Sequence, residues 1–400
     1  MPATPVVAVD VWVDAGSVRE PIVTTGAAHF LEHMIFKGTH RLAPGQFDQI
    51  IERHGGSTNA ATSYDYAHYF INVAPPHLGE ALPHLADLVI NAAIPADEFE
   101  RERDVVLEEL RQSQDDPDWV GFQALVNGLY PAHAYGRPIL GTEASLQQQS
   151  AEAMWRFHRD RYQPHNMTVV VVGDVPLARA EALVEEAFIP AGSLPGSWKP
   201  APETAQAGAP LQPTFNRQQL YLPRLELSRL LMAWHGPGID SIRDAYALDV
   251  LSVLLGGGRS SRLVQELREE RQLVQAIDCS FSLQRQGSLF TITAWLEAQH
   301  LPIVEQIISD RIATLLVDPI PEPELERCKR LLCNDYAFST ETASQLAGLY
   351  GYYSILAADA ALSMAYPTHV GNFQSRDVQQ VARRYISPER YAATVLRPAP

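Results

Sequence analysis

Residues 24–38 read Thr-Thr-Gly-Ala-Ala-His-Phe-Leu-Glu-His-Met-Ile-Phe-Lys-Gly, and this stretch gives the first indication of how the chain folds. Residues 24–26 are of types that can cap the start of a helix. Lys37 and Gly38 are typical of a helix end. The sequence therefore predicts a short helix over residues 27–36, and we work outward from it.

Three polar side chains share one face of this predicted helix. At about 100° per residue, His33 lies about 40° from His29, and Glu32 lies about 60° from it on the other side. Two imidazoles four residues apart can bind one zinc ion, and a neighbouring carboxylate can deprotonate a water molecule. The pattern is H-x-x-E-H, the reverse of H-E-x-x-H. By chance it should occur in about a few per cent of proteins of this size, so a third ligand is needed.

A second predicted helix, which follows Pro95, supplies candidates for the third ligand. Its apolar residues cluster between about 300° and 80° when Glu102 is taken as zero, and they define a buried face: Phe99, Val105, Val106 and Leu110. Glu102 and Glu109 lie on or beside that face, whereas Glu108 lies opposite it. Glu108 is therefore predicted to be solvated.

Burying two carboxylates is costly unless a cation or strong donors receive them. We predict that Glu109 binds the metal together with His29 and His33. The alternative for Glu109 is a structural ion pair, for example with Arg103 or Arg137. Glu102 is predicted to support catalysis by orienting a ligand.

The chain of 400 residues shows an internal repeat and a midpoint linker. Residues 78–90 and 95–101 match residues 301–316 and 321–327 at an offset of 226, and each half ends in a strand. A stretch rich in Pro, Ala, Gly and Ser separates the halves. We predict an α+β fold of two repeats, each with an antiparallel-type sheet backed by helices: residues 1–190 carry the metal, residues 191–213 are the linker, and residues 214–400 form a repeat without metal.

Composition excludes several classes of partner. The formal net charge is −16, from 31 basic and 47 acidic residues, and no basic run interrupts it, which disfavours nucleic acid and anionic membranes. No apolar stretch reaches the about 20 residues that span a bilayer, and from the chain as given we expect no secretory signal. The three cysteines, Cys279, Cys328 and Cys333, fit free thiols in a reducing compartment. We therefore expect a cytoplasmic protein.

With these residues in place, the chain resembles the pitrilysin and insulin-degrading enzyme family, the inverzincins, and in particular its half-length, processing-peptidase branch. The resemblance rests on residues 26–39, on residues 59–62 (Asn-Ala-Ala-Thr) and on residues 102–109, and it covers nearly the whole chain. It implies one Zn²⁺ per chain, with Glu109 as ligand and Glu102 in support. It also implies cleavage of peptides or unfolded segments inside a closed chamber built from four α+β repeats. The chain starts at what resembles the second strand of the family, which is compatible with a truncated start.

The resemblance also implies where a substrate would bind. The edge of the strand around Asn59 and Ala60 would pair with the substrate backbone. Active members, or their partners, place an arginine and a tyrosine seven residues apart in the second half; this chain has Arg268 but Gln275 at the second position. A second, metal-free family member would then complete the chamber as a heterodimer, and a homodimer remains open.

The sequence thus predicts a zinc metallopeptidase in which zinc and Glu32 activate water for hydrolysis of a peptide bond. A non-catalytic assembly subunit of the same fold is the alternative, and a third possibility is a protein that binds metal without cleaving peptides. The intact ligand set favours the peptidase.

Overall fold

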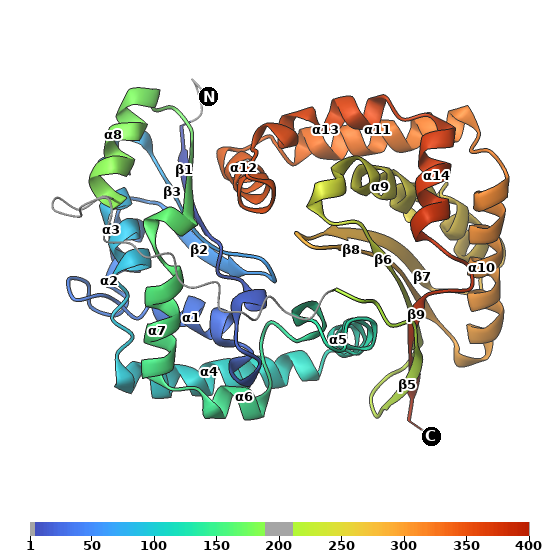
Figure 1. Ribbon diagram of the computed structural model, residues 1–400, viewed down its shortest axis with the longest axis horizontal. Coiled ribbons are helices and arrows are strands. Elements are labelled where there is room, and N and C mark those ends of the chain that lie inside the picture. The colour runs from blue at the N-terminus through green and yellow to red at the C-terminus, as the bar shows by residue number, and fades with distance from the viewer. Residues whose placement is uncertain (1–4, 189–210, 400) are drawn as a thin grey trace. The chain divides into compact units, whose positions relative to one another are not determined.

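A computed structural model describes residues 5–188 and 211–399 of the chain. The chain forms two compact units (Figure 1). The first unit comprises Met1–Arg111, Pro138–Gly208 and Ser339–Ser363, and the second comprises Gln112–Arg137, Ala209–Phe338 and Met364–Pro400. Each unit therefore takes a segment from the other half of the sequence. Residues 191–210 of the predicted linker lie outside the described residues.

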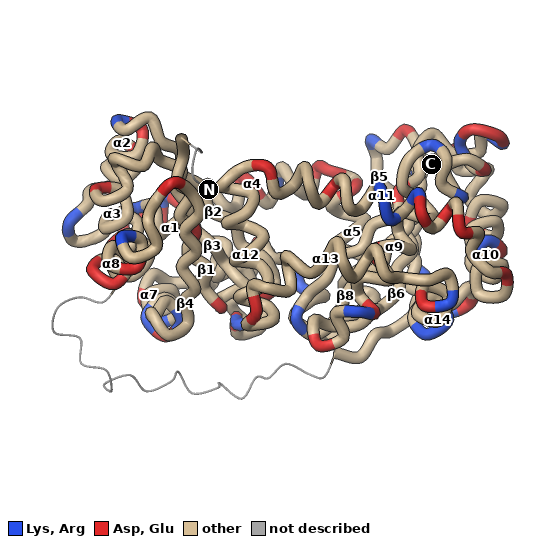
Figure 2. Tube along the Cα trace, turned by 90° about the horizontal axis from the view of Figure 1, so that it is seen from above, with Lys and Arg blue, Asp and Glu red and all other residues tan. Residues whose placement is uncertain are grey.

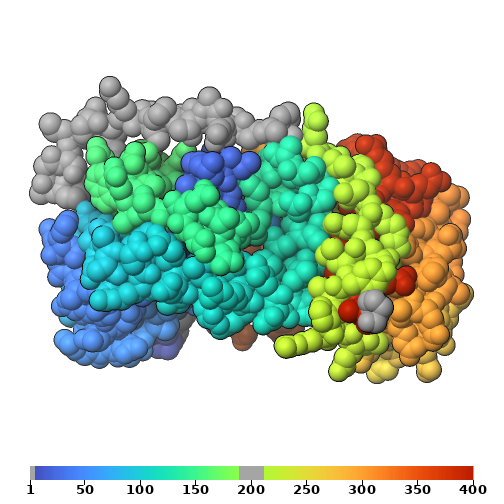
Figure 3. Space-filling view, turned by 90° about the horizontal axis from the view of Figure 1, so that it is seen from below, coloured from blue at the N-terminus to red at the C-terminus, as the bar shows by residue number. Residues whose placement is uncertain are grey.

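The first unit is built on a four-stranded antiparallel sheet in the order β2-β3-β1-β4. Its strands are β1 (Val7–Val13), β2 (Ser57–Thr62), β3 (Ala67–Val73) and β4 (Met167–Val172). Its helices are α1 (Ala27–Ile35), α2 (Gln46–Arg53), α3 (Leu78–Ile90), α4 (Ala96–Gln114, whose last turn belongs to the second unit), α6 (Glu143–Gln148), α7 (Ala151–Arg161), α8 (Leu177–Phe188) and α12 (Ala343–Ala357). The helices α7 and α8, in green, lie at the surface of this unit (Figure 3).

Alternation along β1 gives the sheet two different faces. One face carries valines that are fully buried on the side of the helices that follow β1, namely Val7, Val9, Val11 and Val13. Ala8, Asp10 and Trp12 point to the opposite face. In β3, paired residues such as Tyr69 and Ile71 extend the apolar face and are fully buried. The core of this unit therefore lies between this face and its helices.

The opposite face of this sheet is covered by α12, a helix from the second half of the sequence (Figure 1). Ala343 and Ala347 of α12 form a buried cluster with Ala8 and Val172 of the sheet. Further along α12, the backbone of Gly351 lies directly against the indole of Trp12. Small residues let this helix approach the sheet closely.

The second unit has a five-stranded sheet in the order β5-β9-β6-β8-β7, antiparallel except for the β5–β9 pair. Its strands are β5 (Arg217–Leu222), β6 (Ser228–Gly236), β7 (Ala276–Leu283), β8 (Ser288–Leu296) and β9 (Ala392–Pro398). Its helices are α5 (Pro117–Leu129), α9 (Ile242–Gly256), α10 (Leu301–Val317), α11 (Glu322–Phe338) and α14 (Ser375–Tyr385), while α13 (Ala361–Gly371) spans the boundary between the units. A π-helix occupies Val264–Glu270.

The two sheets confirm the predicted duplication. The order β7-β8-β6-β9 repeats the order β2-β3-β1-β4, and β5 is an additional edge strand. The second sheet is covered in the same way as the first, because α5, from the first half of the sequence, packs on β6 and β9. An added methyl group on Gly121 of α5 would lie 3.0 Å from Leu396 and 3.2 Å from Leu231. The α+β class and the antiparallel character of the sheets are as predicted.

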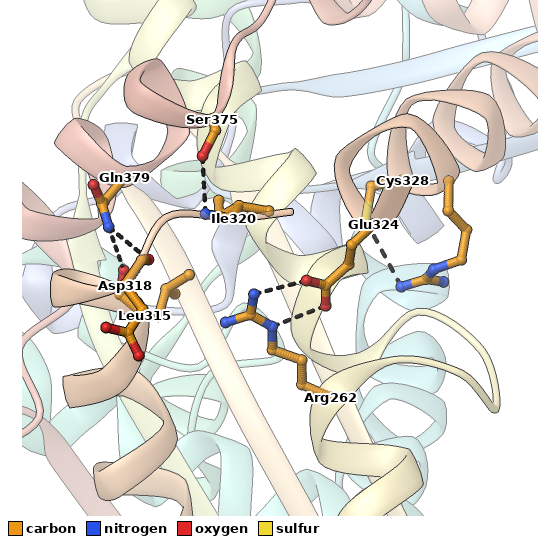
Figure 4. A network of polar contacts seen from close by, with 9 residues as sticks. Arg262, Leu315, Asp318, Ile320, Glu324, Cys328, Ser375 and Gln379 are labelled. Carbon is orange, nitrogen blue, oxygen red and sulfur yellow. Dashed lines mark hydrogen bonds and ion pairs between the residues drawn. The ribbon is translucent and has the colours of Figure 1, made fainter. Parts of the chain in front are cut away.

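Polar contacts join the helices of the second unit to its loops (Figure 4). Arg262 forms a two-pronged ion pair with Glu324, and Gln379 donates to the carbonyl oxygens of Leu315 and Asp318. Cys328, close to this pair, is fully buried. All three cysteines are free, as predicted. Among the described residues, no helix is both long enough and apolar enough to cross a membrane.

Two glycines of α12 provide a test of the close approach to the first sheet. A Cβ on Gly351 would lie 1.9 Å from Nε1 of Trp12, whereas one on Gly348 would meet nothing within 4 Å. Gly351→Ala should therefore lower the free energy of unfolding by about 1–3 kcal/mol through overpacking. Gly348→Ala should raise it by about 0.5–1 kcal/mol, because alanine favours helix. Urea denaturation of both variants measures this, and equal effects would contradict the packing of α12 on Trp12.

Candidate metal centre

The helix α1 begins at Ala27, as predicted, but its cap comes from a residue that sequence reasoning missed. The carboxylate of Glu20, which is 4% exposed, accepts hydrogen bonds from the backbone amides of Gly26 and Ala28 at 2.9 and 2.6 Å. Gly26 is the N-cap residue and has a φ of 94°. Thr25 instead donates to the carbonyl oxygen of Ile22. A carboxylate at this end of a helix is favourable, since the first amides lack helical partners.

Packing of α1 on α4 aligns the metal-binding candidates. Phe30 of α1 stacks on Phe99 of α4 with 4.6 Å between ring centroids, and both are fully buried. The remaining apolar residues of α1, Leu31, Met34 and Ile35, are also fully buried. Because the two histidines lie on the remaining face of this short helix, the packing turns them towards α4.

The side chains of His29, His33 and Glu109 lie close together in the structure. Their ligand atoms all lie within 4.8 Å of one another. Nε2 of His29 is 3.5 Å from one oxygen of Glu109, and Nε2 of His33 is 3.4 Å from the other. Ligands at about 2.1 Å from a tetrahedral zinc ion lie about 3.4 Å apart, so these separations fit zinc. Two imidazoles and one carboxylate are also a common catalytic zinc set.

Contacts within the site shift the pKa values of Glu109 and His33. The imidazoles of His29 and His33 beside Glu109 hold the pKa of this carboxyl well below its usual range. For His33, burial lowers the pKa, but the contacts with Glu109 and Glu102 outweigh burial and leave it raised. Within the described part of the chain, Nδ1 of His29 has no hydrogen-bond partner. The carboxyl group of Glu109 is therefore negatively charged where it contacts the two imidazoles.

Glu102 contacts His33 and also Lys37, a partner that was not predicted. Its Oε1 lies 2.9 Å from Nδ1 of His33, and its Oε2 lies 2.6 Å from Nζ of Lys37. Because an ionised carboxylate can only accept, Nδ1 of His33 carries the proton, which leaves the lone pair on Nε2 for a metal. Lys37 follows the end of α1, where the sequence indicated only a helix stop. Its proximity to Glu102 depends on the packing of α1 and α4.

Glu32 has a hydrogen-bond donor from the sheet. The hydroxyl of Thr62, the last residue of β2, donates to Oε2 of Glu32 at 2.5 Å. Both side chains are half-buried. The sequence placed Thr62 in the strand region but gave no signal of this contact, because the two residues are 30 positions apart.

The buried face of α4 differs from the prediction at one residue. Val105 is 50% exposed, while Leu107 is buried together with Phe99, Val106 and Leu110. The buried arc is therefore rotated, so that Glu102 lies at its edge, with 9% of its side chain exposed, and Glu109 lies just outside it, at 41%. Glu108, at 58%, is solvated as predicted and pairs with Arg111. Acidic segments, in red, recur along α4 (Figure 2).

The structural alternative for Glu109 involved Arg103 or Arg137. Arg103 instead pairs with Glu100 and donates to the carbonyl oxygen of Gln149 at 2.9 Å. Arg137 belongs to the second unit, and no ion pair joins it to Glu109 among the described residues. The partners of Glu109 in the structure are the two histidines.

The predicted substrate-binding residues fall in separate units. Asn59 and Ala60 lie in β2, which is an edge strand of the first sheet, and Oδ1 of Asn59 accepts from the amide of Ala60 at 2.9 Å. Arg268 lies in the π-helix of the second unit and pairs with Glu269, which also binds Arg259. Gln275 is exposed.

In the second unit, the positions that correspond to Glu102 and Glu109 hold Cys328 and Asp335. Burial raises the pKa of Cys328 to about 11, so this thiol is neutral. The corresponding helix α9 contains no histidine. Within the described residues, only His29, His33 and Glu109 form a group that could hold a metal ion.

Two family models and several known proteins match this chain. Residues 1–143 match the family model "Insulinase (Peptidase family M16)", and residues 149–332 match "Peptidase M16 inactive domain". The chain is 34% identical over 333 residues to an uncharacterized zinc protease, ML0855, of Mycobacterium leprae (strain TN), covering 82% of this chain and 73% of the relative. It is 30% identical over 397 residues to zinc protease PqqE of Helicobacter pylori (strain ATCC 700392 / 26695), covering 99% and 88%.

Solved structures share the fold over the whole chain. The crystal structure of a protease from Helicobacter pylori superposes with a TM-score of 0.91 at 29% identity, covering 99% of this chain and 94% of that one. A structure titled peptidase M16 inactive domain, from Pseudomonas fluorescens, has a TM-score of 0.89 at 20% identity, covering 100% and 95%, and shows the fold alone. From its two matched models and its relatives, the chain belongs to peptidase family M16, the insulinase family.

Proposed function

We propose that this protein is a zinc metallopeptidase that hydrolyses peptides or unfolded protein segments. The observation that carries the proposal is the convergence of His29, His33 and Glu109 at separations of 3.4 and 3.5 Å. Membership of a peptidase family, and relatives named zinc proteases, support the same activity. The partial exposure of Glu109 leaves the site accessible to a substrate.

Each residue of the site has a part in the proposed reaction. Bound zinc would polarise the scissile carbonyl and lower the pKa of water. Glu32 accepts the proton of the attacking water as the new C–O bond forms, and it returns this proton to the leaving amine as the C–N bond breaks. Glu102 fixes the tautomer of His33, and Lys37 balances the charge of Glu102.

Substrate would bind by adding a strand to the edge of β2. This strand is at the end of the sheet, has one edge that no described strand pairs with, and carries Asn59 and Ala60. Main-chain pairing gives affinity without demanding particular side chains, which suits a peptidase that acts on varied unfolded segments. The side chain of Asn59 would have to release the amide of Ala60 to the substrate.

We propose further that a second family member completes a closed chamber. Arg268 would contribute to gripping the substrate, yet its guanidinium is paired with Glu269, and the exposed residue seven positions later is Gln275. A metal-free partner in a heterodimer would supply the missing tyrosine, and a homodimer is the alternative. Cleavage assays on the purified chain, with and without a candidate partner, distinguish the heterodimer from the homodimer.

Zinc binding can be tested with two neighbouring glutamates. Wild type should bind one zinc ion per chain, and Glu109→Gln should lose affinity by more than the about 10- to 100-fold that outer-shell changes cost. Glu108→Gln is the matched control, because this side chain is solvated and one position away. The zinc content of each variant is measured after dialysis against a weak chelator. Equal retention of zinc by the two variants would contradict the ligand assignment.

Glu32→Gln separates binding from chemistry. The amide cannot accept the proton, so turnover should fall by about 10²- to 10⁴-fold while zinc content stays at the wild-type level. Digestion of an unfolded peptide library, followed by mass spectrometry, measures turnover for both proteins. A zinc-loaded wild type that cleaves nothing, alone or with its partner, would instead support a non-catalytic assembly subunit or a protein that only binds metal.

A further inference from the structure

The contact between Thr62 and Glu32 links the edge strand of the first sheet to the proposed catalytic base. The two oxygen atoms are 2.5 Å apart, which is the range of a short hydrogen bond to an ionised carboxylate. We propose that Thr62 is a positioning residue, which holds Glu32 in the orientation that proton transfer requires. This inference rests on the proposed peptidase function.

Glu32 depends on Thr62 because the neighbouring polar side chains of α1 contact residues of α4 instead. His29 and His33 point to Glu109, and His33 also contacts Glu102. In the described part of the chain, the hydroxyl of Thr62 is the hydrogen-bond donor to the Glu32 carboxylate. A half-buried glutamate with several rotatable bonds would otherwise sample other rotamers, and a small misplacement of a reacting group is costly to rate.

Thr62 is suited to this task by its place in the sheet. It pairs with Ala67 of β3 on one side, so its backbone is fixed by the sheet. The β-branched side chain has restricted rotation about χ1, so the position of the hydroxyl follows the position of the strand. Holding Oε2 of Glu32 in this way leaves the other carboxylate oxygen free to accept a proton.

The same strand offers the free edge to which a substrate would pair. A peptide that adds to β2 alongside Asn59 and Ala60 would brace the strand that holds the base. Binding energy from residues remote from the scissile bond would then improve the position of Glu32, which raises kcat rather than only lowering KM. The strand β2 would thus both pair with the substrate and hold the side chain that orients the base.

Thr58 offers a matched control on the same strand and the same face. Its hydroxyl donates to the carbonyl oxygen of Phe70 at 3.0 Å, and it is half-buried like Thr62. Replacing either threonine with valine removes one hydroxyl at nearly constant volume and keeps a β-branched side chain. A merely structural role of Thr62 would therefore give two similar variants.

The kinetic test compares Thr62→Val, Thr62→Ser and Thr58→Val in the full zinc-loaded chain. Thr62→Val should keep one zinc ion and a KM within about twofold of wild type, and its kcat should fall by about tenfold or more. Thr62→Ser, which retains the hydroxyl, should recover most of kcat, and Thr58→Val should resemble wild type. If Thr62→Val and Thr58→Val have the same kcat, the proposal is wrong.

A second readout needs neither zinc nor activity. In the metal-free protein, the shifts in urea midpoint caused by Thr62→Val and Glu32→Gln should be non-additive, because Thr62→Val removes the donor of this hydrogen bond and Glu32→Gln removes the charge of its acceptor. The shifts caused by Thr58→Val and Glu32→Gln should add. An inactive wild type would contradict the peptidase function alone, since the cycle still measures the contact; additive shifts for Thr62 and Glu32 would contradict the positioning role alone.

Discussion

The candidate metal centre depends on the packing of α1 against α4. The two helices meet through Phe30 and Phe99, whose rings stack in the fully buried core of the first unit. This apolar contact fixes the rotation of both helices, so that the imidazoles of one face the carboxylates of the other. The hydrophobic contact supplies the stability, and the polar side chains at its edge are carried into place by it. A shift of either helix by one residue would turn its polar groups by about 100° and separate them.

The first consequence of this packing is an excess of negative charge. Glu102 and Glu109 are brought into contact with the two histidines, beside which Glu32 lies on α1, and Lys37 pairs with Glu102. Partial burial of several carboxylates is unfavourable without compensation. Each carboxylate is stabilised differently: Glu102 by Lys37 and His33, Glu32 by the hydroxyl of Thr62, and Glu109 only by the imidazoles. Glu109 is thus the carboxylate with most to gain from a divalent cation.

Helical periodicity was enough to predict much of this site. The spacing of His29, Glu32 and His33 placed them on one face, and the phase of α4 selected Glu109 over Glu108, because both arguments depend only on position along one helix. Contacts between distant segments were not predictable in this way. Lys37, Thr62 and Glu20 act through side chains that meet the site only after folding. The exposure of Val105 has a related cause, since the neighbours of α4 decide where its buried arc lies.

The repeat was evident from the sequence, but the exchange of helices between its halves was not. Helix α5 and helix α12 each carry an apolar face, and nothing local to either sequence states which sheet that face will cover. The predicted domains at residues 1–190 and 214–400 stay a prediction, and each compact unit of the structure combines segments from both halves of the sequence. The free edge of β2, by contrast, follows from strand order, which sequence alone did not provide.

In the second unit, the described residues form no group that could hold a metal ion, so this unit shows what the fold itself requires. At the position of Glu102 it has Cys328, fully buried and neutral, on a helix that occupies the same place in the repeat. Around Cys328, the structure is stabilised by the ion pair of Arg262 with Glu324 and by packing of apolar side chains. The architecture is therefore stable with a small apolar group where the first unit has a charged one. Replacing buried charges with apolar groups is often neutral or stabilising, so a fold gains little from keeping them. The carboxylates of the first unit are thus best explained by the chemistry that they would serve in the proposed peptidase.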